Sequence, residues 1–126
     1  MVGVRAVSYT HLREALEYAI KNIRNFHQKQ MPEEMWFTEV DKGLLVGEKT
    51  TPIVDVCLYV PRGKGSFPSV LCMLATPAVV AGVEKIVVVT PPNEEGNVDD
   101  AILAAAKIIG VSEIYKVCLL YTSRCV

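Results

Sequence analysis

The sequence predicts an α/β fold, a parallel β-sheet with flanking helices, and three observations support this prediction. Strand-like and helix-like segments alternate as β-α-β-α-β from residue 56 onward. The strand-like runs at 56–60 and 86–89 are continuously apolar, which is typical of strands in a buried parallel sheet. A long amphipathic helix precedes them. Because helices join parallel strands as crossovers, the alternation favours right-handed β-α-β units.

The first expected element is the amphipathic helix, which begins at Leu12 and ends near Gln30. Glu17 and Lys21 lie on its polar face as an i,i+4 pair. Pro32 suits the first position of a short helical turn that follows. The apolar residues at helical spacing are Leu12, Ala15, Leu16, Ala19, Ile20, Ile23 and Phe26.

Three short strand-like stretches come next. Leu44–Val46 is apolar, and Gly47 after it is expected at a bulge or turn. Thr50–Val54 contains Pro52, which places this strand at the edge of a sheet because proline has no N–H to donate. Val56–Val60 is expected to be buried on both faces.

A second helix is expected between Ser66 and Gly82. Ser66 is a plausible N-cap, and Pro68 is tolerated in the first turn. Pro77 is expected to kink the helix, and Gly82 suits its C-terminal end. Lys85–Thr90 then predicts a second buried strand.

A third helix is expected over Val98–Ile109. Asn97 is its predicted N-cap, and Gly110 indicates its C-terminal cap. Glu113–Val117 predicts the last strand. Residues 1–11 and 118–126 continue no pattern, so we expect both ends to be foreign or disordered, with ordinary frayed termini as the alternative. Residues 12–117 then form one partial α/β domain.

Composition excludes several classes of function. The net charge of −1 and the 7% aromatic content provide neither a basic field nor a stacking platform for nucleic acid. The longest apolar run, Val70–Val83, is shorter than the roughly 20 residues that a membrane span needs. No secretory signal opens the chain, and we expect a cytoplasmic protein.

The four cysteines argue against a zinc ribbon. Cys57, Cys72, Cys118 and Cys125 have no C-x-x-C spacing and no nearby histidine. Cys57 and Cys72 lie inside apolar runs, where small thiols of a reducing compartment pack as core residues.

The loop Arg62-Gly63-Lys64-Gly65-Ser66 is the strongest candidate for ligand binding. It joins a strand to a helix, where an α/β sheet offers free N–H groups and a helix dipole to an anion. It matches neither the Walker loop nor G-x-G-x-x-G, so a solvated turn is an equal alternative. Tyr59 ends the preceding strand and either lines a ligand cleft or packs in the core.

No catalytic or metal-binding set is predicted within the chain. His11 and His27 have no carboxylate or cysteine at ligand spacing. Glu33 and Glu34 are adjacent and point in different directions, which suits paired acid–base work poorly. The acidic cluster Glu94, Glu95, Asp99 and Asp100 reads as a solvated loop and helix start.

Several segments together resemble the histidinol dehydrogenase family in order and spacing. Ile23–His27 and Trp36-Phe37 are similar to its upstream region, and Thr51–Pro61, with its Tyr59-Val60-Pro61, to its strand and loop. The other similar segments are Phe67–Ser69, Ala75–Val83, Val88–Pro92, Ile102–Lys107, Gly110-Val111 and Ile114–Val117. The resemblance covers roughly residues 12–117 and implies an incomplete Rossmann-like domain.

The resemblance implies an NAD-dependent oxidoreductase. Members of this family are zinc-dependent homodimers that oxidise the small alcohol L-histidinol to L-histidine, in histidine biosynthesis. It further implies that Tyr59 contacts NAD. The family's zinc ligands and its catalytic Glu-His pair lie beyond this segment. We therefore expect a fragment that holds cofactor but does not catalyse.

Two departures from the family pattern leave alternatives open. The family has Pro-Gly-Gly where this chain has Pro61-Arg62-Gly63, which suggests a related dehydrogenase acting on another small alcohol. After Lys116-Val117 the family continues Gly-Gly-Ala-Gln, whereas this chain continues with Cys118. A stand-alone, non-catalytic nucleotide-binding module is a further alternative.

Overall fold

The computed structural model describes residues 6–63 and 65–117, which form two sheets and three helices. β1 and β2 pair as an antiparallel hairpin, while β3, β4 and β5 form a parallel sheet in that order. The bounds are α1 Ala6–Gln30, β1 Met35–Asp41, β2 Leu44–Lys49, β3 Asp55–Tyr59, α2 Pro68–Val80, β4 Lys85–Thr90, α3 Asp100–Ile109 and β5 Glu113–Lys116.

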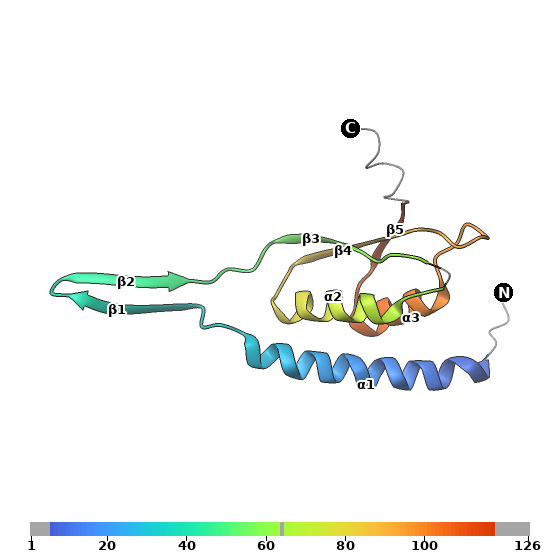
Figure 1. Ribbon diagram of the computed structural model, residues 1–126, viewed down its shortest axis with the longest axis horizontal. Coiled ribbons are helices and arrows are strands. Elements are labelled where there is room, and N and C mark those ends of the chain that lie inside the picture. The colour runs from blue at the N-terminus through green and yellow to red at the C-terminus, as the bar shows by residue number, and fades with distance from the viewer. Residues whose placement is uncertain (1–5, 64, 118–126) are drawn as a thin grey trace.

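The parallel sheet confirms the predicted α/β class. Leu58, Val88 and Ile114 are partners across its three strands. α2 connects β3 to β4, and α3 connects β4 to β5. Because the strand order advances in one direction, crossovers of one hand place both helices on the same face, as Figure 1 shows.

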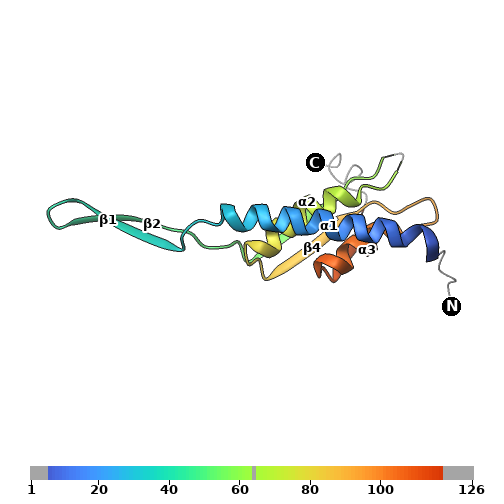
Figure 2. The same cartoon turned by 90° about the horizontal axis from the view of Figure 1, so that it is seen from below.

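The core lies between that face and the helices. Val60 and Val88 are buried beneath Leu71 and Ala75 of α2 and Ala105 of α3. α1 adds a third layer on the far side of α2 and α3 (Figures 1 and 2). It contributes the buried residues Leu16 and Ile20, as its amphipathic pattern predicts.

The other face of the sheet carries no helix in the described ranges, which corrects one expectation. β3 is an edge strand, and Cys57 on its open face is exposed. The prediction that Val56–Val60 is buried on both faces, with Cys57 in the core, is therefore wrong for this part of the chain. Cys72 is buried as predicted, and burial raises the pKa of its thiol. Cys118 and Cys125 lie outside the described residues.

The hairpin is the element that the sequence predicted least well. Leu44–Val46 belongs to β2, but β1 was not predicted, and no helical turn begins at Pro32. Thr50–Val54 forms no strand. Gly47 lies within the ladder opposite Phe37, and the bulge falls instead in β1, between Glu39 and Asp41.

The helix starts also differ from prediction. α1 begins at Ala6, six residues early, and residues 1–5 lie outside the description. Phe67 is the N-cap of α2, with Pro68 in the first turn as expected, while Ser66 caps nothing. Pro77 lies inside α2, as predicted from the sequence.

At α3, Asp99 is the N-cap and accepts a hydrogen bond from the Ala101 N–H at 2.9 Å. Asn97 belongs to the loop before it. Gly82 and Gly110 adopt positive φ at the ends of α2 and α3, which confirms both predicted C-terminal signals.

Thr76 provides a test of the core. Its side chain is fully buried in α2, and its hydroxyl has no hydrogen-bond partner. Thr76→Val should therefore raise the free energy of unfolding by about 1 kcal/mol, measured by urea denaturation. Thr76→Ser keeps the hydroxyl and removes a methyl group, so it should lower stability by about 1 kcal/mol. A less stable Thr76→Val protein would mean that the hydroxyl is satisfied.

Gly47 provides a test of the hairpin. A Cβ there would collide with the backbone carbonyl of Trp36 and the ring of Phe37. We expect Gly47→Ala to disrupt the hairpin alone, shifting the fluorescence of Trp36, the only tryptophan, to longer wavelength while helical circular dichroism stays unchanged. Gly65→Ala is the control, since open space surrounds Gly65. Unaltered Trp36 emission in Gly47→Ala would contradict the packing described.

Candidate functional site

The carboxyl ends of β3, β4 and β5 lie at one edge of the sheet because the strands are parallel. Two loops follow at this edge, residues 60–67 before α2 and 91–99 before α3. The carboxyl edge is where open α/β sheets place their ligands. The predicted loop and Tyr59 therefore both lie at the carboxyl edge of the parallel sheet.

Tyr59 is the last residue of β3 and is half-buried. Its register partner on β4 is Val89, whose partner on β5 is Tyr115. Side chains of partner residues share a face, and their neighbours Leu58, Val88 and Ile114 contact the core. Tyr59 and Tyr115 thus flank Val89 on the helix-free face.

The loop before α2 leaves polar groups without intramolecular partners. The Ser66 hydroxyl is buried and has no hydrogen-bond partner. No side chain caps the first turn of α2, although Pro68 has no N–H there and the Val70 N–H donates to the carbonyl oxygen of Phe67 at 3.1 Å. Gly65 has open space where a Cβ would lie, and Lys64 lies outside the described residues. This loop suits an anionic group near a backbone that can approach closely.

Two cationic side chains tie the loop before α3 to its neighbours. Arg62 donates from Nη1 to the carbonyl oxygen of Pro92 at 2.8 Å, across 30 residues of sequence. Lys116 donates from Nζ to the carbonyl oxygen of Gly96 at 3.0 Å. One nitrogen of the Arg62 guanidinium, Nη1, is thus already used in a hydrogen bond within the protein.

Asn93 stabilises the same loop from within. Its Oδ1 accepts hydrogen bonds from the N–H groups of Glu95 at 3.0 Å and Asn97 at 2.7 Å. The sequence did not predict that Asn93 stabilises this loop, nor that Lys116 donates a hydrogen bond to it. The run Asn93-Glu94-Glu95-Gly96 has the composition of a turn, which was the available signal.

The remaining candidates do not gather at the carboxyl edge. His11 lies on α1, 4.0 Å from Glu14, and His27 packs edge-on against Phe26 with ring centroids 5.4 Å apart. Glu33 and Glu34 lie at the base of the hairpin, which leads to the amino end of β3. Across residues 6–63 and 65–117, no three His, Cys, Asp or Glu side chains form a possible metal site.

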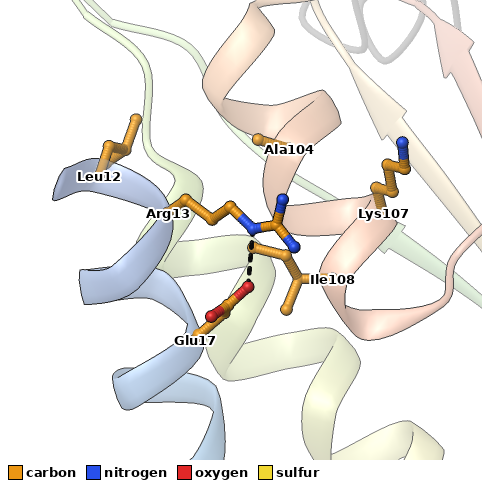
Figure 3. Close-up of a pocket in the computed structure, with 6 residues that line it drawn as sticks. All are labelled: Leu12, Arg13, Glu17, Ala104, Lys107 and Ile108. Carbon is orange, nitrogen blue, oxygen red and sulfur yellow. Dashed lines mark hydrogen bonds and ion pairs between the residues drawn. The ribbon is translucent and has the colours of Figure 1, made fainter. Parts of the chain in front are cut away.

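A hollow of about 430 Å³ lies between α1 and α3 (Figure 3). Arg13 points from α1 toward α3 and pairs with Glu17 at 2.7 Å, which raises the pKa of Arg13. Lys107 lies across the hollow. A larger, mainly apolar groove of about 600 Å³ lies where the hairpin joins the body.

The fold places the chain in the class of α/β proteins with a parallel sheet, in which ligands bind at the carboxyl ends of the strands. Within the described part of the chain, no helix is long and apolar enough to cross a membrane. The sequence profile described as histidinol dehydrogenase matches residues 4–118. The chain belongs to the histidinol dehydrogenase family.

Individual relatives support the same family assignment. The chain is 54% identical over 105 residues to a histidinol dehydrogenase of Synechocystis sp., covering 83% of this chain and 24% of that protein. It is 53% identical over 103 residues to "Histidinol dehydrogenase homolog 2" of Mesorhizobium japonicum, covering 82% and 23%.

A solved structure supports the same family assignment. The crystal structure of histidinol dehydrogenase from Elizabethkingia anophelis superposes with a TM-score of 0.80 at 35% identity, covering 86% of this chain and 25% of that one. The chain thus spans about a quarter of the length of these relatives.

The hydrogen bond from Arg62 to Pro92 can be tested without a ligand. Arg62→Gln should weaken the tie to the loop, and amide hydrogen exchange at residues 93–97 should accelerate about fivefold, as expected for the loss of about 1 kcal/mol. The matched control is Arg24→Gln on α1. Equal exchange in wild type and Arg62→Gln would contradict a positioning role for Arg62.

Proposed function

We propose that this chain forms the NAD-binding side of a histidinol dehydrogenase, an enzyme that oxidises the small alcohol L-histidinol. The observation that carries the proposal is the family match over residues 4–118. The position of Tyr59 at the carboxyl edge supports it. Relatives named histidinol dehydrogenase and histidinol dehydrogenase homolog are equally similar, at 54% and 53% identity.

The residues at the carboxyl edge fit a dinucleotide. Tyr59 offers a ring for stacking and a hydroxyl for hydrogen bonding. The uncapped first turn of α2 and the buried Ser66 hydroxyl offer donors to a phosphate. Arg62 and Lys116 hold the 91–97 loop in place beside them. When bound, NAD accepts the hydride, and this chain's contribution is to bind and orient it.

Zinc does not fit the described residues, which contain no metal-binding cluster. We infer from the family resemblance that the zinc ligands and the catalytic Glu-His pair lie in sequence beyond this segment. We propose that the complete enzyme is a cytoplasmic homodimer and that this chain alone does not oxidise histidinol.

The experiment that tests the proposal is NAD binding by the 126-residue chain, measured by isothermal titration calorimetry. We expect Tyr59→Ala to weaken binding about tenfold, because aromatic stacking on a base contributes about 1–3 kcal/mol. Tyr59→Phe distinguishes the two roles, since it removes the hydroxyl and keeps the ring.

Tyr18→Ala is the matched control, because Tyr18 is an exposed tyrosine on α1, separated from the sheet by α2 and α3. It should bind NAD as wild type does. Absence of NAD binding by the wild-type chain would overturn the proposed function. Equal affinities of wild type and Tyr59→Ala would overturn the role of Tyr59 alone.

A further inference from the structure

The two loops at the carboxyl edge of the sheet carry opposite charges. The loop before α2 contains Arg62 and Lys64 and no carboxylate, a net charge of +2. The loop before α3 contains Glu94, Glu95 and Asp99 and no cation, a net charge of −3. A ligand that lies across both loops therefore meets positive charge at one end and negative charge at the other.

These two loops are neighbours in space. At the start of the loop before α2, the Val60 N–H donates to the carbonyl oxygen of Val89 on β4 at 2.9 Å. Arg62 then donates from Nη1 to the carbonyl oxygen of Pro92 at 2.8 Å. Figure 1 shows both loops at the same end of the parallel sheet. One ligand can therefore contact both of them.

The acidic loop has a defined backbone conformation. The Asn93 N–H donates to the carbonyl oxygen of Asn97 at 2.7 Å, and the Gly96 N–H donates to the carbonyl oxygen of Asn93 at 2.9 Å. The Asn93 side chain adds its hydrogen bonds from the N–H groups of Glu95 and Asn97. These contacts enclose Glu94 and Glu95, so the backbone of both glutamates is fixed within the fold.

The carboxylates of Glu94 and Glu95 are free to interact with a ligand. Both side chains are exposed, and neither carboxylate forms a hydrogen bond or an ion pair within the described part of the chain. The neighbouring cations Arg62 and Lys116 are used differently, because each donates to a backbone carbonyl oxygen of the acidic loop. Asp99 is already the N-cap of α3. The unpaired negative charge of this edge thus belongs to the two glutamates.

The position of the two glutamates matches a known feature of dinucleotide recognition. In β-α-β units that bind NAD, the pyrophosphate lies at the start of the first helix, and an acidic residue further along the chain accepts a hydrogen bond from the ribose 2′-hydroxyl. Here β3, α2 and β4 form that unit, and the glutamates follow β4 directly. NADP carries a phosphate in place of that hydroxyl, which adds a charge of about −1.5 to −2.

We propose that Glu94 and Glu95 select NAD over NADP. Their carboxylates accept a hydrogen bond from the ribose 2′-hydroxyl of NAD and repel the 2′-phosphate of NADP, while the pyrophosphate lies at the basic loop before α2. Arg62 is a positioning residue, since it joins the two loops through the carbonyl oxygen of Pro92. The inference rests on the proposed function and deepens it, because it assigns the residues that distinguish the two cofactors.

The test compares the affinities of NAD and NADP for the 126-residue chain by isothermal titration calorimetry. We expect wild type to bind NAD at least about tenfold more tightly than NADP. Glu94→Gln with Glu95→Gln should reduce this ratio about tenfold, mainly by strengthening NADP binding. Glu94→Asp with Glu95→Asp keeps both charges and should keep most of the preference.

The matched control is Glu33→Gln with Glu34→Gln. This pair is also adjacent and exposed, but it lies at the base of the hairpin, away from the carboxyl edge. It removes the same charge and should leave the ratio at the wild-type value. Raising the salt concentration from about 0.05 M to about 0.5 M should narrow the wild-type preference, because salt screens repulsion between exposed charges. Circular dichroism verifies the fold of each variant.

The failures are distinguishable. Equal affinities of wild type for NAD and NADP, or tighter binding of NADP, would overturn this inference and leave the proposed function standing. A preference that survives in Glu94→Gln with Glu95→Gln, or that the control pair also lowers, would overturn the role of the two glutamates. Absence of NAD binding by wild type would overturn the proposed function and this inference with it.

Discussion

The parallel sheet depends on the burial of one of its faces beneath α2 and α3. Val60 and Val88 are fully buried there, opposite Leu71 and Ala75 of α2. α2 also contacts α1 on its far side, which explains why its sequence is apolar almost throughout. The carboxyl edge takes its position from this packing, because the same crossovers that build the core determine where the strands end and where the loops before α2 and α3 lie.

The same packing leaves the opposite face of the sheet open within the described chain. Tyr59 and Tyr115 flank Val89 on that face, beside the two crossover loops. The matched residues cover only 23% and 24% of two relatives, so most of the relatives' sequence has no counterpart in this chain. These two side chains and the two loops make up the edge of the sheet on which the proposed function rests. Arg62 and Lys116 contribute indirectly, by holding the 91–97 loop.

The hairpin follows a different physical rule from the body. Its strands pair with each other through the backbone, with Phe37 lying over Gly47, and no residue of either strand is buried. Its stability therefore depends on surfaces outside the described chain.

The sequence by itself determined the elements whose causes are local. The apolar runs predicted β3 and β4, and Gly82 and Gly110 marked the helix ends, because strand burial and left-handed backbone leave a signature in adjacent residues. The family resemblance likewise followed from the order of those segments. Both predicted N-caps were wrong. Asn97 is as suitable by residue type as Asp99, and α2 begins at Phe67 without any side-chain cap, so residue type did not favour the actual N-cap over Ser66.

Only the tertiary structure decided which face of the sheet is covered, that β1 pairs with β2, and that Arg62 bonds to Pro92. Each of these depends on residues that are distant in sequence and meet through the path of the chain. A continuous apolar run such as 56–60 is compatible with one covered face or two. The choice depends on how many layers the rest of the polypeptide supplies, and that information lies outside the run itself.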